Sequence, residues 1–152
     1  MEKDAELSEN LEDYLEVILE LEKTRKVARG KEIAQKLNIQ PGSVTGALKT
    51  LDKKGLINWE KYGYITLTKK GLNIAENITQ RHEVLKNFLV NVLQIEKDSA
   101  DATACRMEHA IDDTTMSKLV SFIEYLNACP HAETNCTRAF VAYCEANGVD
   151  QT

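Results

Sequence analysis

Apolar residues recur every three or four positions along most of this chain, which is the spacing of one face of an α-helix. The pattern predicts helices over residues 7–23, 29–37, 43–54, 68–93, 98–111, 115–128 and 137–147. Between residues 56 and 67 it changes to two short segments of strand character, 56–60 and 64–67, with Gly63 in the turn between them. The chain is therefore predicted to be mainly α with one small β-hairpin.

The first part of the chain has the element order of a winged helix-turn-helix domain. Pro41-Gly42 interrupts the pattern between the second and third predicted helices, and Gly55 ends the third. Ser8 and Ser43 are placed to cap the first and third helices. Because a helix-turn-helix pair is followed by a hairpin, we assign residues 1–71 to a DNA-binding domain of this class.

Residues 72–152 are assigned to an all-helical domain. The apolar faces of 84–93 and 119–126 are wider than one small helical layer can bury, so part of them is expected in a homodimer interface. The chain has 152 residues, of which 43% are hydrophobic, as in globular proteins. It contains no apolar run of about 18 residues that would span a membrane, and its acidic N-terminus is unlike a targeting peptide, so we expect a cytoplasmic protein.

Charge is distributed in blocks, although the net charge is −5. Residues 1–22 carry a net charge of −8, residues 23–70 carry +9, and residues 71–152 carry −6. The basic block coincides with the predicted helix-turn-helix and hairpin, which favours a polyanion as partner, whereas the acidic blocks favour a cation. Solvated helix faces would produce the same blocks, so charge alone does not decide between these interpretations.

The predicted DNA-binding surface contains many lysines and few side chains that can contact bases. Gln40 can contact a base edge, Pro41 a thymine methyl, and Ser43 and Thr45 either phosphates or base edges. Gly46 has no side chain where a base-contacting residue could stand, so we expect substantial shape-dependent recognition. The lysines expected to neutralise phosphates are Lys31, Lys36, Lys49, Lys53 and Lys61.

Residues of metal-ligand type occur in both acidic blocks. Cys105, Glu108 and His109 are spaced i, i+3 and i+4, which places a thiol, a carboxylate and an imidazole on one helix face. Three further residues are candidate metal ligands, namely Asp13, Glu16 and His82. Taken alone, Asp13 and Glu16 are explained by a solvated helix face, and His82 by a capping or core histidine. A shared site would require the three helices to converge.

Several motifs together resemble the diphtheria-toxin-repressor family of metal-dependent transcriptional regulators. The matching segments are Leu-Glu-Asp-Tyr-Leu-Glu (11–16), Pro-Gly-Ser-Val-Thr (41–45), Leu-Thr-Lys-Lys-Gly (67–71), Arg-His-Glu (81–83) and Ala-Cys-Arg-Met-Glu-His (104–109). The resemblance covers residues 7–130 and implies a dimeric repressor of iron or manganese homeostasis genes, which binds a palindromic operator when its metal is bound. It is closest in kind to the short members that lack the C-terminal SH3-like domain.

The resemblance also implies a ligand set. Carried over by position, the family's metal ligands fall on Asp13, Glu16, His82, Cys105, Glu108 and His109, and Asp101 falls near an ancillary position. The set is a hybrid, because Asp13, Glu16 and His82 resemble manganese-type members, whereas Cys105 resembles iron-type members. A thiolate is a softer ligand and favours Fe(II), whereas a carboxylate oxygen suits Mn(II). We expect Fe(II) first and Mn(II) next, with Zn(II) or Co(II) able to occupy the site in vitro, and one or two metals per subunit.

Other interpretations stay open at this point. A thiol redox-sensing regulator would use Cys105 or the tail cysteines, and a metal-buffering protein would bind acidic partners through its basic block. The tail contains Cys129, Cys136, Cys144 and His131, which do not have a standard zinc spacing. The cysteines are either buried or surface thiols on a helical tail, or part of a structural zinc or redox site. An enzyme with a small organic substrate is not expected, since Cys105 and His109 lie on one helix with no third catalytic group nearby.

Overall fold

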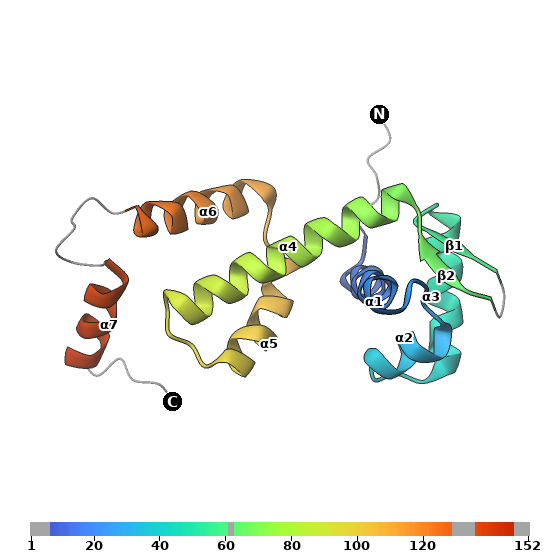
Figure 1. The fold of residues 1–152 in the computed structure, drawn as a ribbon, viewed down its shortest axis with the longest axis horizontal. Helices are drawn as coiled ribbons and strands as arrows, with labels where there is room; N and C mark the ends of the chain where they lie inside the picture. The colour runs from blue at the N-terminus through green and yellow to red at the C-terminus, as the bar shows by residue number, and fades with distance from the viewer. Residues whose placement is uncertain (1–6, 61–62, 129–135, 148–152) are drawn as a thin grey trace. The chain divides into compact units, whose positions relative to one another are not determined.

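The structure, a computed structural model, describes residues 7–60, 63–128 and 136–147. Within these residues it contains seven helices and one two-stranded antiparallel sheet, which confirms the predicted fold class (Figure 1). The elements are α1 (Glu9–Arg25), α2 (Gly30–Lys36), α3 (Pro41–Lys53), β1 (Ile57–Trp59), β2 (Ile65–Leu67), α4 (Lys69–Asn91), α5 (Lys97–Glu108), α6 (Asp113–Asn127) and α7 (Cys136–Ala146).

The chain divides into two compact units. The N-terminal unit comprises residues Met1–Thr79 and the C-terminal unit comprises residues Gln80–Thr152, so that α4 contributes residues to both. The boundary predicted after residue 71 lies in the first turn of α4. No helix in the described part of the chain is long and apolar enough to cross a membrane.

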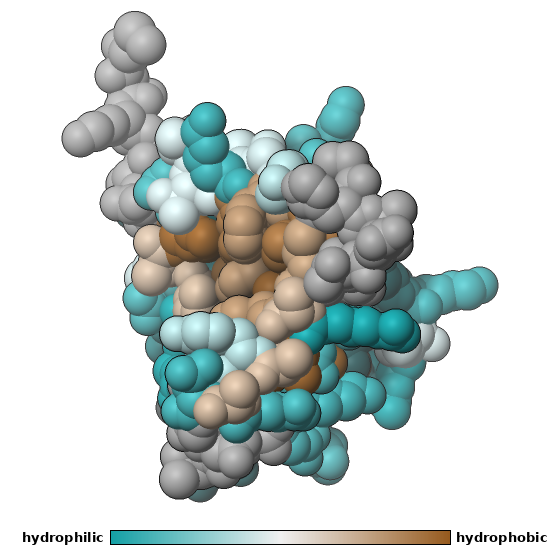
Figure 2. Space-filling view, turned by 90° about the vertical axis from the view of Figure 1, so that its left-hand side faces the viewer, coloured by the Kyte–Doolittle hydropathy of each residue, from teal (hydrophilic) through white to brown (hydrophobic). Residues whose placement is uncertain are grey.

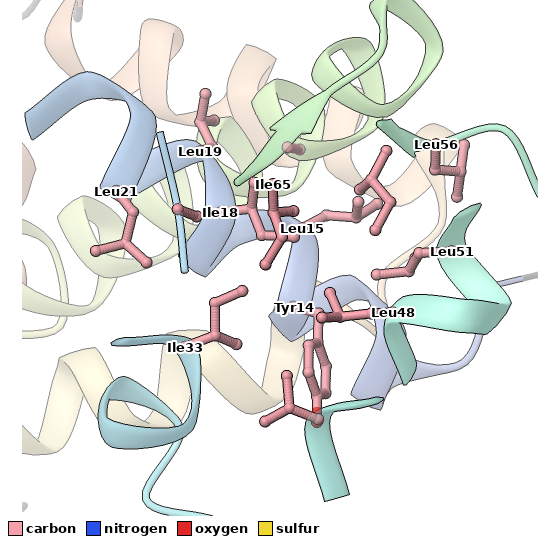
Figure 3. Packing of buried hydrophobic residues seen from close by; sticks show 14 of the residues in the cluster. Tyr14, Leu15, Ile18, Leu19, Leu21, Ile33, Leu48, Leu51, Leu56 and Ile65 are labelled. Carbon is pink, nitrogen blue, oxygen red and sulfur yellow. The ribbon is translucent and has the colours of Figure 1, made fainter. Parts of the chain in front are cut away.

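The N-terminal unit has a hydrophobic core to which α1, α2, α3 and the hairpin all contribute. Figure 3 shows Leu15 and Ile18 of α1 beside Ile65 of β2, and all three side chains are fully buried. Ile33 of α2 and Leu51 of α3 are also fully buried in this cluster. Burial of each such side chain stabilises the fold by about 1.5–3 kcal/mol relative to leaving it exposed. The core therefore fixes the helix-turn-helix pair against α1 and the hairpin.

The turn between α2 and α3 differs from the prediction in one respect. α3 begins at Pro41 and Gln40 takes the N-cap position, so the prediction that Ser43 caps this helix is wrong. Proline suits the first helical position, because its fixed φ is already helical and the N–H that it lacks would have no intrahelical partner there. Asn38, with φ 53°, is the left-handed residue that ends α2. Ser43 consequently lies inside the first turn of α3, where its side chain is exposed.

Two glycines shape the connection from α3 to α4. Gly55 has φ +68° and ends α3 as predicted. α4 begins at Lys69, close to the predicted start at residue 68, and runs through Gly71 without a break. Glycine is required there for space: a Cβ atom on Gly71 would lie 1.9 Å from the carbonyl oxygen of Leu56. The start of α4 therefore packs directly against the backbone that leads into β1.

The C-terminal unit buries few of its apolar side chains. Its core cluster consists of Leu85 and Leu89 of α4 with Ala100 and Ala104 of α5. Neither α6 nor α7 contains a buried residue, and their exposed large apolar side chains are Phe122, Tyr125, Phe140 and Tyr143. Figure 2 shows apolar side chains gathered on one face of this unit with polar side chains around them. An exposed patch of this kind is typical of an interaction surface.

Candidate metal centre and nucleic-acid interface

The last turn of α5 brings three residues of metal-ligand type together. One donor atom from each of Cys105, Glu108 and His109 lies within 4.8 Å of the others. α5 ends at Glu108, but His109 keeps right-handed helical dihedrals in the C-cap position, so the i, i+3, i+4 face is preserved. Cys105 is exposed, whereas Glu108 is 1% exposed. His109 Nε2 lies 3.3 Å from Glu108 Oε1.

α4 adds His82 to this group from the facing helix of the same unit. His82 Nδ1 lies 2.6 Å from Glu108 Oε2, and His82 Nε2 lies 3.3 Å from Asp101 Oδ1. Burial acts to lower the pKa of His82, but its hydrogen bonds and charge interactions with Glu108 and Asp101 outweigh burial, so the pKa is raised. His82, Cys105, Glu108 and His109 therefore form one cluster within the C-terminal unit.

A second ion pair adjoins this cluster. Lys86 Nζ of α4 donates to Asp101 Oδ1 of α5, next to the contact with His82. The Lys86 ammonium group and then His82 hold the pKa of Asp101 below its usual range, and the same hydrogen bond raises the pKa of Lys86. Asp101, which the sequence analysis placed near an ancillary metal position, thus contacts two residues of α4, the ammonium group of Lys86 and the imidazole of His82.

The cluster fits a divalent transition metal by the chemistry of its donors. Imidazole nitrogen, thiolate sulfur and carboxylate oxygen are all ligands of Fe(II), Mn(II) and Zn(II). Ligand atoms lie about 2.0–2.3 Å from such an ion, and hence at most about 4.6 Å from each other. The donor atoms of Cys105, Glu108 and His109 all lie within 4.8 Å of one another, so the three residues are near enough to share one ion. Glu108 is a buried carboxylate, and a buried anion requires compensation by positive charge.

Asp13 and Glu16, the remaining predicted ligands, belong to the N-terminal unit. They lie one turn apart on α1, and both are partly buried. Thr79 Oγ1 donates to Glu16 Oε1 over 3.4 Å. Asp13 lines a hollow of about 730 Å³ together with side chains of α3. The two carboxylates thus share one face of α1, and their role as ligands stays a prediction.

Arg81 is a residue of this region that the sequence analysis did not single out. Its Nη1 atom lies 3.3 Å from the carbonyl oxygen of Ile111 and 3.5 Å from that of Glu108, and Nη2 pairs with Asp113. These contacts tie α4 to the corner between α5 and α6, directly after the α5 ligands. A signal was present in the Arg-His-Glu motif, where Arg81 precedes His82, but its partners are about 30 residues away in sequence.

The candidate DNA-binding surface is a groove between α3 and the hairpin, with a volume of about 790 Å³. Its lining includes three predicted DNA-binding residues, Lys31, Pro41 and Thr45. It also includes residues that the sequence analysis missed, chiefly Arg29 and Tyr64. The Arg29 guanidinium carbon lies 5.1 Å from the centre of the Tyr64 ring, and Arg29 Nη2 donates to the Tyr64 hydroxyl over 3.2 Å. This pair connects the start of α2 to the hairpin and presents a cation beside the groove.

The other predicted DNA-binding residues are distributed around this groove. Gln40, Lys49 and Lys53 are exposed, and Lys36 is paired with Glu20 of α1 at 2.5 Å. Ser43 lines the hollow between α1 and α3 instead of the groove beside the hairpin. Lys61 lies outside the described residues, as do Cys129 and His131 of the tail. Cys136 and Cys144 are partly buried thiols on α7.

Comparison with known protein families supports both parts of this description. A family model described as the N-terminal DNA binding domain of iron dependent repressors matches residues 6–65. A second model, the metal binding and dimerisation domain of iron dependent repressors, matches residues 68–137. The first match ends at the start of β2, and the second begins directly after this strand.

Individual relatives are transcriptional regulators. An uncharacterized HTH-type transcriptional regulator of Methanocaldococcus jannaschii is 38% identical over 119 residues, covering 78% of this chain and 95% of that protein. The HTH-type transcriptional regulator MntR of Bacillus subtilis is 30% identical over 116 residues, covering 76% of this chain and 81% of MntR.

Solved structures of similar fold include metal-dependent regulators. The manganese regulator SloR matches with a TM-score of 0.69 and 30% identity, covering 78% of this chain and 55% of that chain. A manganese-dependent transcriptional repressor in complex with manganese matches with a TM-score of 0.70 and 27% identity, covering 76% and 53%. The chain thus spans about half the length of these regulators. A hypothetical protein of Sulfolobus solfataricus matches with a TM-score of 0.62 and 27% identity, covering 82% and 95%.

Proposed function

The chain belongs to the iron-dependent repressor family of metal-dependent transcriptional repressors, and from this premise we propose that it represses metal-homeostasis genes by binding a palindromic operator as a homodimer when Fe(II) or Mn(II) is bound. The relatives and the matching families are transcriptional regulators and not enzymes. The observation that carries the proposal is the convergence of His82, Cys105, Glu108 and His109 from two helices around a nearly fully buried carboxylate.

We propose that these four side chains and the α1 carboxylates Asp13 and Glu16 hold the metal. When bound, the metal supplies the positive charge that allows several anionic ligands to share one site. The family resemblance supports the inclusion of Asp13 and Glu16, as does their position on one face of α1. Because α1 packs against α3 in the core of the N-terminal unit, ligands on α1 couple metal binding to the placement of the DNA-binding helix.

For the metal itself we propose Fe(II) as the first choice and Mn(II) as the second. Cys105 provides a thiolate, which favours the softer Fe(II), and the oxygen ligands of α1 are tolerated by both ions. Similar solved structures that are named as manganese regulators support Mn(II) as the alternative. Zn(II) and Co(II) are expected to occupy the site in vitro, because a site with imidazole and thiolate ligands has high affinity for both.

For the DNA we propose that the exposed face of α3 enters the major groove, with the hairpin against the backbone. Lys31, Pro41 and Thr45 line the groove between α3 and the hairpin, and Arg29 presents a cation there. The exposed aromatic side chains of α6 and α7 provide apolar surface for a two-fold interface, which would match a palindromic operator. Sedimentation velocity of wild type and Phe122→Lys tests this interface, and an unchanged dimer in the variant would place it elsewhere.

The central test is DNA binding measured by fluorescence anisotropy under anaerobic conditions, with promoter fragments of metal-transporter genes. Protein is titrated without metal and then with Fe(II), Mn(II), Zn(II) or Co(II), for wild type and Cys105→Asp. We expect metal-dependent binding whose preference moves from Fe(II) toward Mn(II) in the variant. Cys144→Ser, which removes a thiol on α7, is the matched control and should retain the wild-type preference.

Three results would overturn the proposal. Tight DNA binding without metal, unchanged on titration, would remove the metal switch, and a response to peroxide in metal-free protein would favour a thiol redox regulator instead. Metal binding without salt-dependent binding to duplex DNA would favour a metal-buffering role, because protein–DNA affinity falls with salt by about 0.9 log units per phosphate contact and decade of salt.

A further inference from the structure

We propose that Asp101 is a positioning residue that holds His82 with Nδ1 directed toward Glu108 and the metal, and that Lys86 holds Asp101 in place for this task. The inference rests on the proposed metal-dependent function and deepens it. It concerns residues of α4 and α5 within the C-terminal unit, and it gives Asp101 and Lys86 roles outside the ligand set.

The two ring nitrogens of His82 have different partners. Nδ1 lies 2.6 Å from the buried oxygen Oε2 of Glu108, and Nε2 lies 3.3 Å from Oδ1 of Asp101. A neutral imidazole carries one N–H, and the nitrogen that binds a metal is the one without hydrogen. If Nε2 keeps the hydrogen and donates it to Asp101, Nδ1 is available for a metal that Glu108 also binds. Metal-binding histidines commonly donate their second nitrogen to a carboxylate in this way, which fixes the tautomer and the ring orientation.

Lys86 makes Asp101 suited to this role. Lys86 and His82 lie one turn apart on α4, and both contact Oδ1 of Asp101 on α5. The ammonium group neutralises the carboxylate, so Asp101 competes less for the metal as a ligand while it still accepts the hydrogen bond from His82. The Asp101 side chain is 51% exposed, in contrast to the fully buried carboxylate of Glu108. The exposed, lysine-paired carboxylate of Asp101 therefore suits a positioning residue, and the buried carboxylate of Glu108 suits a metal ligand.

The experiment measures the nitrogen shifts of His82 and the metal affinity in the full-length protein. The chain has three histidines, so ¹⁵N-labelled imidazole spectra of the Zn(II)-loaded protein are readily assigned by single substitutions. The variants are Asp101→Ala and Lys86→Met. Asp98→Asn is the matched control, because it removes an exposed carboxylate one turn earlier on α5 that also acts on Lys86 through its charge. Affinity and stoichiometry are measured with Mn(II) by electron paramagnetic resonance and with Zn(II) by chelator competition.

In wild type we expect Nδ1 of His82 to show the shift of a metal-bound nitrogen and Nε2 that of a protonated one. Asp101→Ala should lower metal affinity by about 10–100-fold, the range known for partners of metal-binding histidines, with unchanged stoichiometry. Lys86→Met should cause a smaller loss in the same direction, and Asp98→Asn should match wild type.

Three outcomes would overturn the inference. The first is that Asp101→Ala keeps the wild-type ¹⁵N shifts of His82 and the wild-type metal affinity. The second is that Asp101→Ala binds one metal ion fewer per chain. The third is that Lys86→Met binds metal more tightly, or binds one additional metal ion. The second and third would make Asp101 a ligand. Failure of the proposed function has a different signature, since wild type would then bind neither Mn(II) nor Zn(II) at the His82 nitrogens.

Discussion

Gly71→Ala should destabilise the N-terminal unit and weaken DNA binding. A Cβ atom at this position would lie 1.9 Å from the carbonyl oxygen of Leu56, whereas even short C–H···O contacts keep carbon and oxygen about 3.3 Å apart. The backbone of α4 or of Leu56 must therefore move by more than about 1 Å. Because Leu56 also accepts a hydrogen bond from Thr68 N at 3.0 Å and leads into β1, the movement is transmitted to the hairpin.

The expected magnitude combines two opposing effects. Overpacking a tight contact costs about 1–3 kcal/mol or more, whereas replacing glycine by alanine in a helix gains about 0.5–1 kcal/mol. We expect a net loss of about 1–2 kcal/mol, equivalent to a fall in Tm of about 2–8 °C for a chain of this length. The matched control is Gly46→Ala on α3, where a Cβ atom would meet nothing within 4 Å. In this control the alanine makes no close contact, so only the higher helix propensity of alanine should act, and it should raise the free energy of unfolding by about 0.5–1 kcal/mol.

The assay is urea unfolding monitored by the fluorescence of Trp59, the one tryptophan of the chain, which lies on β1 in the N-terminal unit. This reporter follows the relevant unit even if the two units unfold separately. Operator affinity measured by anisotropy gives the second readout. If Gly71→Ala and Gly46→Ala shifted the midpoint in the same direction, the argument from the close approach to Leu56 would be refuted.

Three further predictions concern Arg81, Arg29 and Glu22. Arg81→Met should destabilise the C-terminal unit by about 1.5–3 kcal/mol, because it removes a charged donor to the carbonyl oxygens of Glu108 and Ile111. The variant should also bind Mn(II) more weakly. Chemical denaturation without metal measures the first effect, and its change on adding Mn(II) measures the second. Arg29→Met should weaken operator binding and reduce the magnitude of the log–log salt slope by about 0.9 if the guanidinium contacts one phosphate, as anisotropy over a salt series would show. Burial raises the pKa of Glu22, and this effect outweighs the hydrogen bond from Leu67 N, which lowers it. The folded state therefore holds the proton of Glu22 more tightly than the unfolded chain does, and stability falls as the pH rises through this pKa. Glu22→Gln keeps the hydrogen-bond acceptor but does not titrate, so the Tm of the variant minus that of wild type should increase from pH 4 to pH 7. An equal Tm difference at pH 4 and pH 7 would contradict the argument.

Local sequence patterns were sufficient for the fold and for part of the site. The helices and the hairpin followed from apolar spacing, because each element presents an apolar face at the period of its secondary structure. The grouping of Cys105, Glu108 and His109 followed from the i, i+3, i+4 rule, which holds even though α5 ends at Glu108. The start of α3 was misplaced because serine and proline both signal a helix N-terminus, and proline took the first helical position.

The residues that the sequence analysis missed share one property, namely partners that are distant in sequence. Arg81 contacts residues 27 to 32 positions later, and Arg29 contacts Tyr64, 35 positions later. Such contacts depend on how helices pack, and no spacing rule along one helix contains that information. The contact of Lys86 could not be predicted for the same reason, because its partner Asp101 lies on α5.

At the proposed metal site, metal preference and fold stability are expected to depend on different side chains. Glu108 is 1% exposed, so its replacement disturbs the packing of α5 against α4 as well as the site. Cys105 is exposed at the same site, and exposed positions tolerate substitution within about ±0.5 kcal/mol. We therefore predict that a change of this one side chain between thiolate and carboxylate alters the choice between Fe(II) and Mn(II) without cost to the fold. On this basis Cys105→Asp should retain the wild-type urea midpoint without metal while its metal preference changes, and a large loss of stability would show that the thiol has a packing role instead.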